Sequence, residues 1–67
     1  MTKTLDLHKI KHDDAERLVE NFVLLNENPL TIITGNSDNM KKIVVDKLKQ
    51  LNIKYEQWAN KGEYKIL

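Results

Sequence analysis

Cysteine is absent from this chain of 67 residues, which excludes disulfide bonds and zinc sites built from thiolates. This absence fits a reducing compartment, and we expect a cytoplasmic protein. No apolar run reaches the roughly 18 residues that a transmembrane helix requires, and the first residues lack the apolar segment of a signal peptide. The sequence therefore predicts a protein without membrane spans.

A clear excess of positive charge is also absent, because eleven Lys and Arg side chains are balanced by ten Asp and Glu side chains. Strong nucleic-acid binders usually carry such an excess, so the net charge alone does not point to nucleic acid. Hydrophobic residues make up 40% of the chain, which is typical of a globular protein rather than a disordered one. This length allows one thin core, so we expect a single domain over residues 1–67.

Hydrophobic periodicity predicts four strands and two helices. Apolar residues alternate or run together in the strand candidates and recur at helical spacing in the helix candidates. The predicted strands are 3–8, 30–34, 53–58 and 63–67, and the predicted helices are 12–26 and 40–51. The order β-α-β-α-β-β predicts an α/β two-layer sandwich (α+β), with a four-stranded mixed sheet and both helices on one face.

Cap and turn residues mark the ends of these elements. Ser37 or Asp38 can cap the second helix, and Asn52 can end it because Asn tolerates the left-handed conformation. Lys11 is a poor cap for the first helix. Gly62, in a turn over residues 59–62 before the last strand, is free to take a positive φ.

Polar side chains gather where the first two strands end. Asp6 and His8 alternate with two leucines, so we expect them on one face of a strand, about 7 Å apart. Thr34 and Gly35 end the second strand, and parallel neighbours bring their carboxyl ends to the same edge of a sheet. Imidazole suits proton transfer near neutral pH, and a carboxylate can orient it.

The same edge is a predicted anion site. Both helices begin there and offer N–H groups with partial positive charge. Lys9, Lys11, Asn36 and Ser37 lie beside it and are candidate phosphate contacts, while Asp38 would repel a phosphate. The spacing of ligands that is typical of a zinc site is missing, so we predict no metal-binding site formed by the side chains.

Leu5-Asp6-Leu7-His8 resembles the LDLH signature of Smr (small MutS-related) domains. Thr34-Gly35 stands about one helix downstream, where a T-G-x-G or H-G-x-G loop follows in that family. The resemblance covers nearly the whole chain and indicates a minimal stand-alone member. It implies a fold similar to the C-terminal domain of bacterial translation initiation factor three. It also implies DNA-nicking or RNA-cleaving endonuclease activity, or nucleic-acid binding alone.

By this resemblance, Asp6 and His8 are catalytic, and Thr34 and Gly35 hold the scissile phosphate. Lys9 and Ser37 stand where the family usually has glycines, and the loop after Gly35 is shorter. The alternatives are a catalytically silent DNA- or RNA-binding module and a protein-interaction domain that uses the open sheet face. The sequence does not choose DNA over RNA, and it does not decide whether Mg²⁺ takes part or whether the chain forms oligomers.

Other residues have simpler interpretations. His8 can bond the sheet edge, and Asp6 can bond backbone N–H groups of the neighbouring loop. Trp58 can stack on a base, although packing is the commoner role of an aromatic side chain. Five lysines could form a basic flank that binds nucleic acid, but a solvated face is the simpler interpretation. They are Lys41, Lys42, Lys47, Lys49 and Lys54.

Overall fold

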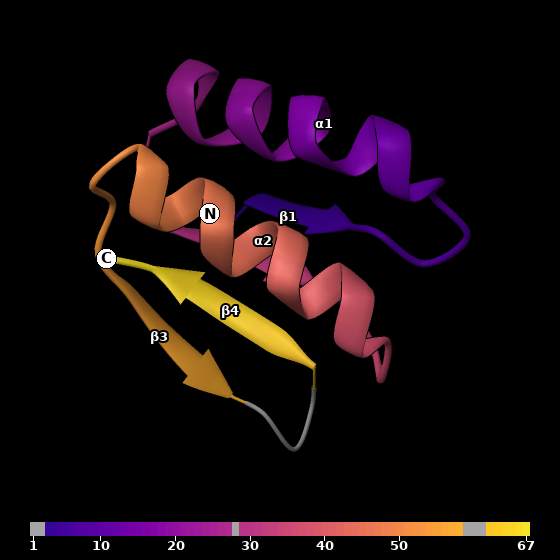
Figure 1. The fold of residues 1–67 in the computed structure, drawn as a ribbon. Helices are drawn as coiled ribbons and strands as arrows, with labels where there is room; N and C mark the ends of the chain where they lie inside the picture. Colours follow the sequence, from indigo (N-terminus) through magenta and orange to yellow (C-terminus); the bar gives the residue numbers. More distant parts are fainter. Residues whose placement is uncertain (1–2, 28, 59–61) are drawn as a thin grey trace.

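The computed structural model describes residues 3–27, 29–58 and 62–67. The elements, in chain order, are β1 (Lys3–Asp6), α1 (His12–Leu25), β2 (Leu30–Ile33), α2 (Asp38–Gln50), β3 (Tyr55–Trp58) and β4 (Glu63–Ile66) (Figure 1). The predicted order β-α-β-α-β-β is confirmed. Of the predicted turn at 59–62, only Gly62 lies within the described residues.

The four strands form one mixed sheet in the order β1-β2-β4-β3. β1 and β2 are parallel, because α1 carries the chain back between them, and β4 is antiparallel to both β2 and β3. The carboxyl ends of β1 and β2 and the start of β4 therefore meet at one edge of the sheet. This edge is where the sequence places its polar residues.

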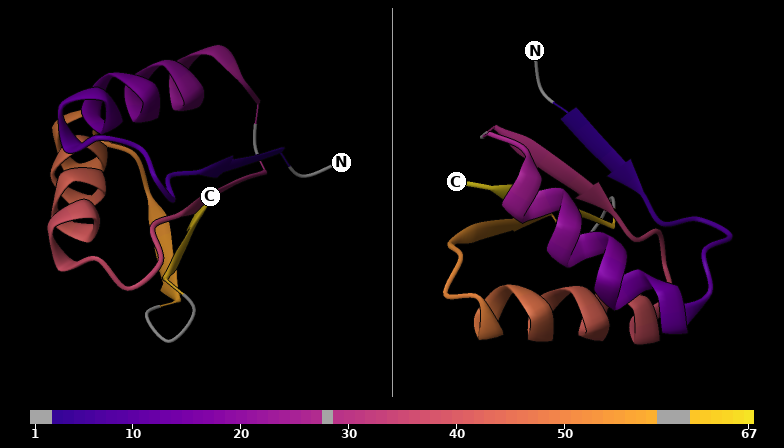
Figure 2. Two further views of the ribbon diagram at one scale, coloured as in Figure 1. Left: turned by 90° about the vertical axis from the view of Figure 1, so that its right-hand side faces the viewer. Right: turned by 90° about the horizontal axis from the view of Figure 1, so that it is seen from above.

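The core lies between the helices and one face of the sheet. Figure 2 shows both helices on the same side of the strands, as predicted. Buried and partly buried residues alternate along β2 and β4, because successive side chains of a strand point to opposite faces. The buried hydrophobic residues are Leu7, Ala15, Val19, Leu30, Ile32, Met40, Val44, Leu48, Tyr64 and Ile66. No helix of the described residues covers the other face of the sheet, and we call it the open face.

The helix ends follow the predicted cap chemistry. Ser37 caps α2 by accepting a hydrogen bond from the N–H of Met40 at 3.2 Å. Asn52, just beyond α2, takes a left-handed conformation with φ of 58°. Lys11 at the start of α1 makes no side-chain cap bond, as expected from its side chain. No helix in the described ranges is long and apolar enough to cross a membrane.

Lys47 does not belong to a solvated face or a basic flank, so the prediction for this lysine is wrong. Its side chain is buried between α2 and α1, and its Nζ lies 3.0 Å from Glu16 Oε1 and 3.6 Å from Glu20 Oε1. It also donates to Gln50 at 2.8 Å. The hydrogen bond with Glu16 raises the pKa of Lys47 above its ordinary value. A helix that packs on another helix buries the stem of a long side chain and keeps its charged end paired.

The first strand ends at Asp6, two residues earlier than predicted. Leu7 still donates its N–H to the carbonyl of Ile33 at 2.9 Å, but Lys9 then takes a positive φ of 65° and turns the chain toward α1. His8 therefore sits in a turn and not in a strand. From this turn the His8 ring reaches back to Asp6, and its Nδ1 lies 2.7 Å from Asp6 Oδ1.

Lys9→Gly is expected to stabilise the protein. A side chain in the left-handed region costs about 1–2 kcal/mol, and glycine removes this cost but adds chain entropy to the unfolded state of about 0.4–1 kcal/mol. We expect a net gain of about 0.5 kcal/mol in the free energy of unfolding, measured by thermal and denaturant unfolding. Lys11→Gly, at extended φ of −69°, is the control and should destabilise. Equal effects of the two substitutions would contradict a strained Lys9.

Candidate functional site

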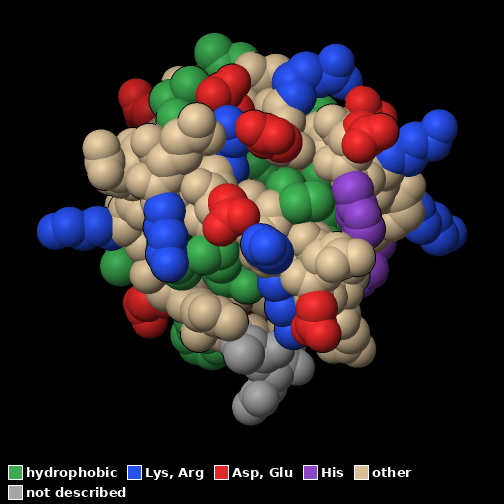
Figure 3. All heavy atoms as spheres, viewed as in Figure 1, with side chains coloured by type: hydrophobic (Ala, Val, Ile, Leu, Met, Phe, Trp, Pro, Cys, Tyr) green, Lys and Arg blue, Asp and Glu red, His purple; other side chains and the backbone are tan. Residues whose placement is uncertain are grey.

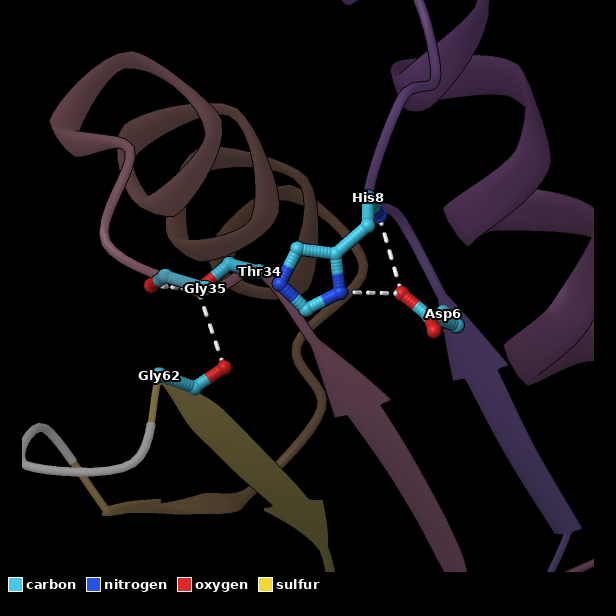
Figure 4. Close-up of polar contacts among 5 residues, drawn as sticks. All are labelled: Asp6, His8, Thr34, Gly35 and Gly62. Carbon is cyan, nitrogen blue, oxygen red and sulfur yellow. Dashed lines mark hydrogen bonds and ion pairs between the residues drawn. The ribbon is translucent and has the colours of Figure 1, made fainter.

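Asp6 and His8 form a hydrogen-bonded pair at the end of β1. Asp6 Oδ1 lies 2.7 Å from His8 Nδ1 and also accepts the backbone N–H of His8 at 2.9 Å (Figure 4). Both side chains remain more than half exposed, at 58% for Asp6 and 57% for His8. A carboxylate that accepts from Nδ1–H holds the neutral ring in the tautomer whose Nε2 carries the lone pair.

The His8 backbone N–H is the largest cause of a lowered Asp6 pKa, and the His8 ring is the second. A carboxyl group whose pKa falls on folding stabilises the protein above its unfolded pKa. That contribution is lost as the pH falls through the folded pKa. Asp6 is therefore ionised throughout the neutral range and keeps His8 oriented there. The pair should come apart only in acid below the ordinary Asp value of 3.8.

The carboxyl carbon of Asp6, followed by NMR against pH, should titrate below 3.8 in the wild type. In His8→Ala the ring hydrogen bond is gone while the backbone N–H bond remains. We therefore expect the midpoint to move upward without reaching the ordinary value. An unchanged midpoint in His8→Ala would show that the ring does not contact Asp6 in solution.

Gly35 lies directly against the imidazole of His8. A Cβ built at Gly35 would stand 2.6 Å from His8 Nε2 and 3.0 Å from Cδ2, closer than real Cβ atoms approach. The φ of Gly35 is 68°, which a larger residue adopts only with strain. Glycine is therefore required here twice, for its backbone conformation and for the space that the ring occupies. As Figure 4 shows, Nε2 points toward this loop and away from Asp6.

A third segment completes the site, namely Gly62 at the start of β4. Its carbonyl accepts the N–H of Thr34 at 2.7 Å, the N–H of Gly35 at 3.3 Å and the hydroxyl of Thr34 at 3.0 Å. The Thr34 hydroxyl also lies 3.1 Å from the carbonyl of Gly35 and is buried. The Thr34 hydroxyl, the Thr34 N–H and the Gly35 N–H thus all donate hydrogen bonds within the protein, and these bonds hold the loop under His8. We call Asp6, His8, Thr34, Gly35 and Gly62 the strand-end site.

The remaining predicted contacts lie close to this site along the chain. The side chains of Lys9, Lys11, Asn36 and Ser37 are exposed, on the turn after β1 and on the loop before α2. Figure 3 shows histidine side chains on one flank of the molecule, with Lys or Arg side chains and Asp or Glu side chains nearby. The positive charge that an anion needs is therefore present at the rim, outside the loop that Thr34 and Gly35 make.

Within the described residues, no group of three or more His, Asp or Glu side chains could hold a metal ion. Asp38, which the sequence brings into the neighbourhood, has an exposed side chain in the first turn of α2.

The sequence did not predict the contact between Gly62 and the strand-end site. Gly62 was expected only to turn the chain, and its φ of 62° confirms that expectation. The structure adds that the Cα of Gly62 faces Gly35. A Cβ at Gly62 would stand 2.2 Å from the Gly35 carbonyl oxygen. One feature of the sequence could have pointed to this contact. The chain has only two glycines, Gly35 and Gly62, and both lie at this edge of the sheet.

Comparison with protein-family models, with curated proteins and with solved structures finds no match to this chain. The Smr resemblance therefore stays a prediction carried by Leu5-Asp6-Leu7-His8 and by Thr34-Gly35. The fold itself is a small α+β fold in which β1 ends at a carboxylate–imidazole pair and the parallel β2 ends beside it.

Proposed function

We propose that this protein is a nucleic-acid-processing Smr-like domain, an endonuclease that nicks DNA or cleaves RNA. The observation that carries the proposal is the 2.7 Å contact of Asp6 Oδ1 with His8 Nδ1, on an exposed edge with Nε2 directed away from Asp6. An imidazole oriented by a carboxylate is a general base, and an exposed one can be reached by a polymeric substrate.

In the proposed reaction, His8 Nε2 accepts the proton of the attacking hydroxyl, which is water or, in RNA, the neighbouring 2′-hydroxyl. The new P–O bond forms as the bond to the leaving oxygen breaks, and the protonated ring returns a proton to that oxygen. Asp6 keeps the ring in the required tautomer and stabilises its charged form. Lys9 and Lys11 bring positive charge to the phosphate, with Asn36 and Ser37 as further donors.

A catalytically silent binding module is the second candidate, and one observation favours it. The Thr34 hydroxyl and the Gly35 N–H both donate to the Gly62 carbonyl, so neither is free to stabilise charge on a phosphate. The exposed lysines at the rim could bind nucleic acid without that contribution. Binding would then occur at the same edge with no cleavage.

The test is cleavage of supercoiled plasmid and of a structured RNA, each with and without Mg²⁺. His8→Ala should lower the rate by about 10²–10⁴-fold while leaving binding within a few-fold, because a general base acts in the transition state. His12→Ala is the matched control, since it removes the other histidine of the chain, which has no carboxylate partner among the described contacts. It should retain the wild-type rate.

The outcomes separate the candidates. Cleavage that is unchanged in a folded His8→Ala variant would refute the assigned base. Binding that weakens steeply with salt, without cleavage in either metal condition, would leave the silent module. Neither cleavage nor binding would refute both nucleic-acid functions and favour a protein partner on the open face.

A further inference from the structure

A row of four side chains crosses the open face of the sheet from the strand-end site to the far edge. The pairing partners in this row are Asp6 with Ile33, Ile33 with Glu63, and Glu63 with Trp58. Paired residues of neighbouring strands point to the same face, and neighbouring strands lie about 4.8 Å apart. Trp58 therefore stands about 14 Å from Asp6 along a direct line across β2 and β4.

Trp58 is the single tryptophan of the chain, and it lies on the open face with 40% of its surface exposed. Lys65, on the same face of β4, places its Nζ 4.3 Å from the centre of the Trp58 ring. An aromatic ring and a cation together match the two chemical parts of a nucleotide, the flat base and the negative phosphate. Neither group is needed to fill the core, which lies on the other face.

We propose that the open face binds a single-stranded nucleic-acid segment, with one base stacked on Trp58 and the chain running along this row to the phosphate at His8. The inference rests on the proposed function and adds its substrate class. A base in a duplex is stacked between its neighbours and cannot lie on a protein ring, so this contact selects an unpaired segment. A sheet with an exposed aromatic side chain on its free face is suited to splayed bases.

The acidic residues of the face fit bases better than phosphates. Glu63 is half-buried between Ile33 and Trp58, and Glu56 lies opposite Lys65. A carboxylate accepts hydrogen bonds from base amino groups, as Glu does from cytosine N4, and repels phosphate. Bases would therefore face the sheet while phosphates point outward toward solvent, Lys65 and the lysines of the rim.

The single tryptophan makes the test direct, because all indole fluorescence comes from Trp58. His8→Ala protein, which should not cleave the probe, is titrated with a short oligouridylate, with oligodeoxythymidylate and with a mixed-sequence duplex. Both single strands should quench the fluorescence and the duplex should not. Labelled strands then measure affinity by anisotropy for Trp58→Ala, Trp58→Phe and, as control, Leu24→Ala, an exposed apolar residue on α1.

Trp58→Ala should weaken single-strand binding about tenfold or more, Trp58→Phe should recover part of it, and Leu24→Ala should bind as the parent does. Salt-dependent binding that neither quenches Trp58 nor changes in Trp58→Ala would overturn this inference and leave the proposed function in place. Preferential binding of the duplex would also overturn it. If no probe binds and wild type cleaves nothing, both the inference and the proposed function fail.

Discussion

Replacing Gly62 by alanine should lower the free energy of unfolding by about 2–5 kcal/mol, since overpacking costs about 1–3 kcal/mol and the left-handed conformation about 1–2 kcal/mol. The added Cβ would stand 2.2 Å from the carbonyl oxygen of Gly35, 2.6 Å from its carbonyl carbon and 2.7 Å from its Cα. All three neighbours are backbone atoms, which cannot rotate away as a side chain can. The site must therefore open or the hairpin must shift.

The expected loss is comparable to the whole stability of a domain of this size, about 0.05–0.15 kcal/mol per residue or roughly 3–10 kcal/mol. A shift of the hairpin would also break the three hydrogen bonds that the Gly62 carbonyl accepts from Thr34 and Gly35. We therefore expect Gly62→Ala to be largely unfolded at 37 °C, measured by circular dichroism and denaturant unfolding.

Asn52→Ala is the matched control, because Asn52 has nearly the same φ of 58° but its side chain is exposed. Asn52→Ala places alanine in the left-handed conformation without a steric overlap of its Cβ, so the free energy of unfolding should fall by only about 1 kcal/mol. If Gly62→Ala loses no more than Asn52→Ala, then Gly62 and Gly35 are not in contact in solution. The described strand-end site would then be wrong at its third segment.

Gly35→Ala should abolish the proposed activity with a smaller effect on stability. The nearest atoms to its added Cβ belong to the His8 ring, at 2.6 and 3.0 Å, and this ring is an exposed side chain that can rotate. Rotation moves Nδ1 away from Asp6 and Nε2 away from the loop. We expect a loss of about 10²-fold or more in cleavage rate, similar to removing the base, with about 1–2 kcal/mol lost in unfolding from the positive φ.

A double mutant separates the two effects of Gly35→Ala. In a His8→Ala background the ring is gone, so adding Gly35→Ala should cost only the backbone conformation and should lower the cleavage rate no further. The Asp6 carboxyl titration gives a readout independent of activity, since its midpoint should rise in Gly35→Ala as it does in His8→Ala. Additive losses of rate in the double mutant would show that the glycine acts by a route other than His8.

Local patterns in the sequence determined the elements and their ends. The order of strands and helices follows from hydrophobic periods of 2 and 3.6, which depend on neighbouring residues alone. The cap at Ser37, the left-handed Asn52 and the positive φ of Gly62 follow from properties of single side chains. The parallel pairing of the first two strands follows from the helix between them, and it brought Asp6, His8 and Gly35 to one edge as predicted.

Tertiary structure alone decided which side chains touch. His8 meets Asp6 at 2.7 Å because β1 ends early and Lys9 turns the chain, and Lys47 is buried because α1 happens to lie over that face of α2. Thr34 contacts Gly62 across 28 residues of sequence, and the row from Asp6 to Trp58 draws on all four strands. Such contacts depend on strand order and register, which are set by the packing of the whole core, and no local pattern contains them.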